Sequence, residues 1–257
     1  MPRRPNATRR WLTALTWPVG VTLTSWDYMW RSTPLHRREV AEPPLPRHLG
    51  PAFPEGIDDT DVVGVDGGRG PLFHRRYRTR IRNAQLSAPA LMAELKRDLN
   101  QAAPTTFARF QKVLGDEDRF ALGDEFVVRM PGPWDGPVRV VADEERSFRL
   151  ATLAGHLEAG QIEFRVRPGD PDSPDDPDRS NRPGDGDPSR VLTFEIESWA
   201  RSADRFADLL YHRARMAKEI QLHMWISFLE GVVGVSGGRM TGGIDIDTRR
   251  IEDAFPA

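Results

Sequence analysis

The stretch D-R-F-A-D-L-L-Y-H-R-A-R-M-A-K-E-I-Q-L-H-M-W-I-S-F-L, residues 204–229, has the apolar spacing of one long helix. One face of this helix is apolar except for a single arginine, and it carries Phe206, Leu210, Arg213, Ala217, Ile220, Met224 and Phe228. A helix with one apolar face must bury that face against another element. The residues before it should therefore supply the surface on which it packs.

Most of the pattern between residues 71 and 202 is typical of β-strands. Residues 71–82 alternate, so that one face should lie in solvent and carries His74, Arg76, Arg78, Arg80 and Arg82. The other face can be buried and carries Phe73, Arg75, Tyr77, Thr79 and Ile81. Further strands are expected at Glu125–Met130, Pro137–Ala142, Ser147–Leu153 and Gln161–Arg167, the last of which forms a hairpin with Val191–Phe194.

Two helices are expected after the first strand. Ser87 is a suitable N-cap for a helix over Ala88–Gln101, and a second short helix is predicted over Thr106–Leu114, ended by Gly115. The order of strand, helix pair, strands and long helix predicts an α+β fold in which a curved antiparallel sheet grips the C-terminal helix. This order resembles the helix-grip fold of START-like and Bet v 1-like proteins, which implies an apolar cavity between sheet and helix.

The chain divides into three segments. Residues 1–54 form a basic, tryptophan-rich arm and a proline-rich linker, and residues 55–230 form the domain. Inside the domain, residues 168–190 hold many aspartates and no apolar side chain except proline, which predicts a disordered acidic insertion. Glycines and mixed charges indicate a weakly ordered tail over residues 231–257.

Composition argues against several classes of function. The formal net charge of −2 disfavours a nucleic-acid partner, and the absence of cysteine excludes disulfides and thiolate metal sites. Because no phosphate-binding or zinc-protease motif is present, we expect no cofactor and no metal site. A cysteine-free chain fits a reducing compartment, so we expect a cytoplasmic protein. The oligomeric state is not predicted.

The N-terminal arm allows two interpretations. Its tryptophans either pack on the surface of the domain or sit at a membrane interface, and they are Trp11, Trp17, Trp26 and Trp30. The threonines among them favour packing on the domain, because polar side chains weaken membrane insertion.

A family resemblance rests on T-L-A-G-H-L-E-A-G-Q-I-E-F, residues 152–164. This stretch resembles the signature T-L-P-G-H-P-E-x-G-E-E-x-F of an uncharacterised family of bacteria and plants, domain-of-unknown-function family nineteen-ninety. The chain departs from that pattern at Ala154, Leu157 and Gln161. With G-D-E-F-V-V from Gly123 and F-E-I-E-S-W-A-R-S over residues 194–202, the resemblance covers about residues 107–228. It implies the fold and no established reaction.

Two features could carry chemistry. His156 with Glu158 or Glu163 could form a general base or a metal ligand set, whereas the alternative is a hairpin turn in which His156 binds the backbone. Arg213 on the apolar helix face needs an anionic partner. That partner is either the head group of a ligand or an internal acid such as Glu163 or Glu195.

The leading hypothesis is a non-catalytic protein that binds a small apolar or amphipathic molecule in a pocket. The candidate pocket residues are Arg213, Tyr77, Arg75, His156, Glu158, Glu163, Phe206, Leu210, Ala217 and Met224. An enzyme of cyclase or hydrolase type, which uses His156 with Glu158 or Glu163, is the first alternative. A protein that docks on a membrane or a partner through the tryptophan arm is the second.

Overall fold

The computed structural model describes residues 33–43, 49–105, 108–130, 135–169, 190–203 and 216–252, with the backbone alone for residues 216–221. In these ranges the helices are α2 (Ala88–Arg97), α4 (Met216–Ser236) and the short 3-10 turns η2 (Val65–Gly67) and η3 (Leu99–Gln101). The strands are β1 (Leu35–Glu42), β2 (Arg69–Arg82), β3 (Arg109–Leu114), β4 (Glu125–Arg129), β5 (Gly136–Glu144), β6 (Ser147–Thr152), β7 (Glu158–Pro168), β8 (Leu192–Ser202) and β9 (Arg239–Ile251).

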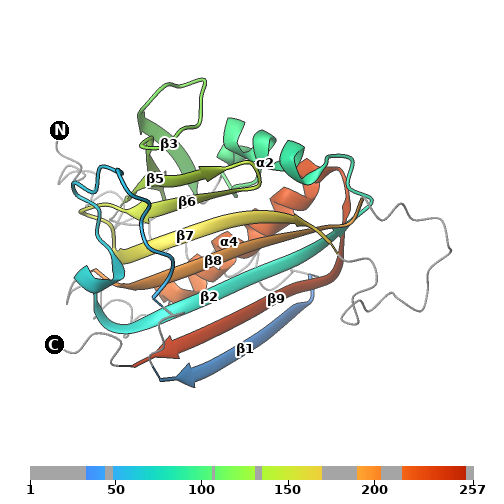
Figure 1. The fold of residues 1–257 in the computed structure, drawn as a ribbon. Coiled ribbons are helices and arrows are strands. Elements are labelled where there is room, and N and C mark those ends of the chain that lie inside the picture. The colour runs from blue at the N-terminus through green and yellow to red at the C-terminus, as the bar shows by residue number, and fades with distance from the viewer. Residues whose placement is uncertain are drawn as a thin grey trace, which may run out of the picture.

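All nine strands belong to one sheet, in the order β1-β9-β2-β8-β7-β6-β5-β4-β3. Figure 1 shows this sheet curving over α4, which runs along its inner face, with α2 beside it. The predicted α+β class and the packing of a long C-terminal helix on the sheet are confirmed. One detail is wrong: the sheet is mixed, because β1 pairs with β9 in parallel, while every other pair is antiparallel.

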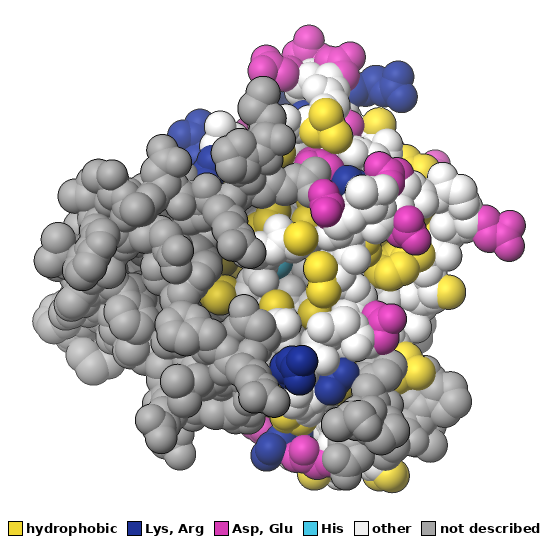
Figure 2. Space-filling model, turned by 90° about the vertical axis from the view of Figure 1, so that its left-hand side faces the viewer, with side chains coloured by type: hydrophobic (Ala, Val, Ile, Leu, Met, Phe, Trp, Pro, Cys, Tyr) yellow, Lys and Arg dark blue, Asp and Glu magenta, His cyan; other side chains and the backbone are white. Residues whose placement is uncertain are grey.

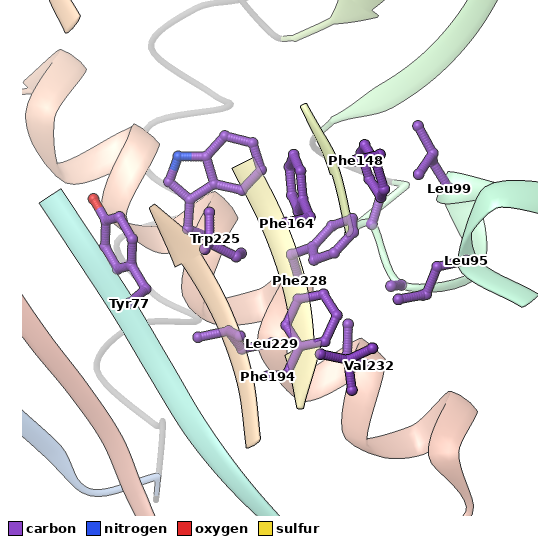
Figure 3. Close-up of a cluster of buried hydrophobic side chains, with 14 of the residues drawn as sticks. Tyr77, Leu95, Leu99, Phe148, Phe164, Phe194, Trp225, Phe228, Leu229 and Val232 are labelled. Carbon is purple, nitrogen blue, oxygen red and sulfur yellow. The ribbon is translucent and has the colours of Figure 1, made fainter. Parts of the chain in front are cut away.

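The core lies between α4 and the inner face of the sheet (Figure 3). Trp225 and Phe228 pack on Phe164 of β7, with ring centroids 5.6 and 5.3 Å apart. Leu229 and Val232 continue this face, since residues spaced by three and four lie on one side of a helix.

The predicted apolar face of the helix is only partly correct. Met224 and Phe228 are buried as expected, but Trp225 is buried too, because this part of α4 is apolar all round. The helix also continues to Ser236, beyond the predicted end at Leu229. Five predicted face positions lie outside the described side chains: Phe206, Leu210, Arg213, Ala217 and Ile220.

The short helix predicted over Thr106–Leu114 is wrong. Residues 109–114 form β3, which pairs with β4, and residues 106 and 107 lie outside the described ranges. Pairing with β4 outweighs a weak helical preference, and Asn100 fixes the entry of the strand. The side chain of Asn100 accepts a hydrogen bond from the Phe110 backbone N–H and donates one to its carbonyl, at 2.8 and 3.0 Å. By contrast, the N-cap predicted at Ser87 is confirmed, because its hydroxyl accepts from the Ala90 N–H.

The weakly ordered tail predicted from residue 231 is also wrong. Residues 231–236 complete α4, and β9 fills the space between β1 and β2. Ile244 and Ile246 point into the core, while the aspartates between and after them point outwards, so the strand alternates in the ordinary way. Similarly, residues 35–42 of the predicted arm form β1; residues 1–32 and residues 170–189 of the acidic insertion lie outside the described ranges.

The outer face of the sheet is covered by residues 49–67, here called the strap. Three buried arginines of the sheet donate hydrogen bonds to carbonyl oxygens of the strap: Arg139 to Asp58 and Thr60, Arg149 to Ala52, and Arg201 to Val65. Such bonds satisfy both the arginines and the strap backbone. None of the helices in the described ranges is long and apolar enough to span a bilayer.

Candidate functional site

The signature residues 152–160 build the turn between β6 and β7. Gly155 occupies the left-handed region with φ of 97°, which a glycine adopts without strain. Gly160 passes so close to β8 that a Cβ there would lie 1.9 Å from the Trp199 carbonyl oxygen. The Thr152 hydroxyl accepts from the Gly160 N–H at 2.9 Å and donates to the Val63 carbonyl of the strap. The geometry of the turn therefore accounts for the residue types at Thr152, Gly155 and Gly160.

His156 binds the backbone of the same turn. Its Nδ1 accepts a hydrogen bond from the Glu158 N–H at 2.9 Å, and the Nε2 side of its ring rests on Gly136. Burial lowers the pKa of His156, although the charge of Glu158 opposes the shift. The neutral ring is therefore favoured, and its Nδ1 faces both the N–H and, at 3.1 Å, the carbonyl oxygen of Glu158.

Arg75 and Glu158 meet across the inner face. The Arg75 side chain is only 3% exposed, and its Nη1 lies 3.8 Å from Oε1 of Glu158, which is 16% exposed. The guanidinium also lies over the Phe73 ring at 4.7 Å. An arginine buried on the face that carries the core is unusual, because such a charge must be balanced where it lies. Glu158 supplies that balance from the signature turn.

Toward this turn the inner face gains polar residues, which stand among apolar ones such as Ile162. Phe164, Ile196, Tyr77 and Ile246 form one apolar row across β7, β8, β2 and β9. In the next row, Ser198 and Thr248 flank Arg75 as its partners in the two neighbouring strands. Rows on one face of a sheet are about 7 Å apart. The polar end, defined here as Arg75, Glu158, Ser198 and Thr248, thus begins one row beyond the aromatic core.

Two buried polar atoms, one in the polar end and one on α4, have no hydrogen-bond partner among the residues that the structure describes. They are Oγ of Ser198 on the sheet and Nε1 of Trp225 on α4, and the two residues are 3% and 6% exposed. In Figure 3 the indole nitrogen of Trp225 and the hydroxyl of Tyr77 point to the same side, away from Phe228 and Val232. Figure 2 looks onto that end of the molecule and shows hydrophobic side chains around a hollow in the described surface.

Glu163 lies apart from this site. The alternation of β7 turns it to the outer face, where it pairs with Arg165 at 2.5 Å, whereas Phe164 points into the core. The predicted pairing of His156 with Glu163 is therefore wrong, while His156 and Glu158 do share one turn. No group of three or more His, Asp or Glu side chains in the described ranges is arranged to hold a metal ion.

The outer face carries a ladder of charges. Glu197 of β8 accepts hydrogen bonds from Nε2 of His74 at 2.7 Å and from Nη2 of Arg76 at 2.8 Å. Burial opposes ionisation, yet these two bonds hold the pKa of Glu197 at about 2. His74 was expected in solvent, and this is wrong: it is buried because its ring stacks on Trp199, 5.4 Å away.

A family model matches the part of the sequence that contains the signature turn and Arg75. Residues 63–227 match the model described as Domain of unknown function (DUF1990). The chain belongs to the DUF1990 family. The match spans residues 63–67 of the strap, the signature turn, strands β2 to β8 and α4 up to Ser227, so the DUF1990 positions include every residue of the polar end except Thr248. No curated protein matches the chain in sequence.

Solved structures with a similar course of the chain share little sequence with this DUF1990 protein. A hypothetical protein from Helicobacter pylori is 11% identical, with a TM-score of 0.43, over 76% of this chain and 96% of its own. Norcoclaurine synthase from Thalictrum flavum is 10% identical, with a TM-score of 0.42, over 64% and 87%. Major latex-like protein 151 from Panax ginseng is 13% identical, with a TM-score of 0.37, over 65% and 99%. Function is therefore argued from this chain's own residues.

Sequence reasoning missed three residues of the site: Ser198, Thr248 and Trp225. Thr248 lies in the segment that was expected to be a weakly ordered tail. Ser198 is an ordinary serine in a strand, and only its register beside Arg75 marks it. Trp225 lies one position from the predicted helix face. A periodicity read from residues 204–229 alone cannot show that the helix is buried all round, although the run Leu222–Ile226 without a charged residue is a signal of it.

Proposed function

We propose that this DUF1990 protein binds a small amphipathic molecule between α4 and the inner face of the sheet. The observation that carries the proposal is the change from aromatic core to polar end along that face, with buried polar atoms on both walls. An apolar surface with a few fixed polar groups is the usual composition of a small-molecule site. The apolar part of the ligand would lie against Tyr77 and Trp225, and its polar part toward Ser198.

The role is proposed to be binding rather than catalysis. Nδ1 of His156 is engaged by the Glu158 backbone, whose N–H and carbonyl oxygen both lie within hydrogen-bond distance, and the Nε2 side of the ring rests on Gly136. Nδ1 is therefore not available as a general base. Because Glu163 lies on the outer face, the cyclase or hydrolase alternative has only the Glu158 carboxylate left, and that carboxylate faces Arg75. We further propose a cytoplasmic location, which the cysteine-free sequence favours.

Native mass spectrometry of the protein purified from its own host tests the proposal. We expect an adduct of one small molecule that is lost when the protein is unfolded. Ala200→Phe should abolish the adduct, because Ala200 lies on the inner face between Gly160 and Phe73. Ala41→Phe on the exposed surface of β1 is the matched control and should retain it.

A synthetic probe covers the case of a ligand lost during purification. Equilibrium dialysis with 2-ethylnaphthalene should show one saturable site in the wild type and in Ala41→Phe, and none in Ala200→Phe. Urea unfolding of each variant confirms that it is folded before dialysis. Absence of both a retained adduct and saturable binding of the probe would refute the proposed function.

A further inference from the structure

The two buried polar atoms that have no partner in the described part of the chain define what the ligand must offer. Nε1 of Trp225 is a donor only, so its complement must be a hydrogen-bond acceptor. The hydroxyl of Ser198 can also donate. A buried polar group without a partner lowers stability, and a ligand that supplies the missing acceptor recovers that free energy as binding affinity.

The two donors belong to opposite walls. Trp225 stands on α4 over Phe164, which pairs with Ile196 of β8. Ser198 follows Ile196 by two residues on the same face of β8. A single oxygen with two lone pairs, held between helix and sheet at the start of the polar end, would offer one lone pair to each donor. A carbonyl oxygen has this capacity and an ether oxygen meets it less well.

Charge at the polar end favours a neutral acceptor. Arg75 is balanced by Glu158 at 3.8 Å, so the described part of the site holds one positive and one negative group. A carboxylate ligand would add a second negative charge beside Glu158, in a buried place where charge is expensive. A ketone or amide carbonyl adds none.

We infer that the ligand carries a neutral carbonyl group whose oxygen accepts hydrogen bonds from Trp225 Nε1 and Ser198 Oγ. This inference rests on the proposed function, because it names the polar group of the same bound molecule. It makes Trp225 the residue that selects carbonyl compounds over hydrocarbons of the same shape.

The test compares 2-acetylnaphthalene with 2-ethylnaphthalene, which differ by one carbonyl oxygen. Equilibrium dialysis measures the ratio of their Kd values in the wild type, Trp225→Phe and Ser198→Ala. Comparing this ratio between the variants cancels the difference in hydration between the two compounds, because that difference is the same for every variant. We expect Trp225→Phe to shift the ratio about tenfold against the ketone, as for a buried donor left without an acceptor, and Ser198→Ala to shift it in the same direction.

Trp199→Phe is the matched control. Trp199 also has a buried Nε1 without a partner among the described residues, but it lies on the outer face, stacked on His74. Its substitution should leave the ratio unchanged. An unchanged ratio in Trp225→Phe, or an equal shift in Trp199→Phe, overturns the inference. If 2-naphthoate binds more tightly than the ketone and loses that advantage in Trp225→Phe, the ligand is anionic and the neutral class is wrong.

A measurement on the unmodified protein keeps the inference testable if Trp225→Phe does not fold. In the nitrogen-15 NMR spectrum of the wild type, 2-acetylnaphthalene should move one indole N–H signal downfield, while 2-ethylnaphthalene should not. Equal effects of the two compounds on every indole signal overturn the inference, and saturable binding of both would still support the proposed function. Absence of binding by either compound instead counts against the proposed function itself.

Discussion

The pKa of Glu197 allows a quantitative prediction about stability. The native carboxyl titrates at about 2, against an ordinary value of 4.5, because His74 and Arg76 donate hydrogen bonds to it. A difference of about 2.5 between these pKa values corresponds to about 3 kcal/mol of folding free energy. Since the native pKa is the lower one, this contribution is fully present above pH 4.5 and is lost as the pH falls toward 2.

The variant Glu197→Gln removes the charge and keeps the shape. We expect it to be about 3 kcal/mol less stable than the wild type at pH 7 and about 1.5 kcal/mol less stable at pH 3, where half of the contribution is already lost. Urea unfolding at both pH values measures the two differences. The side chain of Glu197 is 11% exposed, so screening by solvent should reduce them only modestly.

The control is Glu94→Gln, which breaks the exposed pair of Glu94 with Arg97 on α2. Its cost should stay below about 1 kcal/mol, as is usual for surface pairs. If Glu197→Gln costs the same at pH 3 as at pH 7, the carboxyl is not held ionised by His74 and Arg76, and the reasoning about the outer ladder is refuted.

Three further predictions concern the turn and the insertion. Gly160→Ala should lower the free energy of unfolding by at least about 3 kcal/mol, because its Cβ would lie 1.9 Å from a backbone oxygen. Gly155→Ala has open space around it and should cost about 1 kcal/mol, so equal costs in chemical unfolding would contradict the close approach at Gly160. His156→Gln should lose about 1 kcal/mol of stability at pH 8 and keep probe binding. Because the native pKa of His156 is lowered, the wild type should lose stability as the pH drops below 6.5, and the same dependence of stability on pH in the variant would contradict this. Replacing residues 170–189 with Asn-Gly should change stability by less than about 1 kcal/mol, because Pro168 and Leu192 already pair, and a loss above about 2 kcal/mol in thermal unfolding would show that the segment packs on the domain.

Local patterns predicted the fold well where one face of an element is clearly apolar. The alternation in residues 71–82 and the hairpin of β7 with β8 are visible because a strand places every second residue in the core. β3 and β9 escaped, since β3 is a short edge strand and β9 alternates isoleucines with charged residues next to several glycines. Both segments form strands because they pair with adjacent strands of the sheet, and a short stretch of sequence does not show such pairing.

The candidate site was predictable residue by residue but not as a group. Arg75, Tyr77 and Glu158 were expected to face the interior, and they do. That Arg75 reaches Glu158 depends on the register of β2, β8 and β7, which no local pattern contains. Glu163 was placed in the site because it is close in sequence to His156, although its position in β7 already turns it outward.

The position of β9 between β1 and β2 has a consequence for how the protein is made. A ribosome releases residues 35–42 some two hundred residues before their only neighbour in the described sheet, residues 239–251. Until then β1 cannot join the sheet, and the edge of β2 stays open to any other strand in the cell. Of the strands in the described sheet, the one synthesised last is thus the one that joins β1 to β2. Chains that stop before residue 239 should expose that edge and depend on chaperones or be degraded.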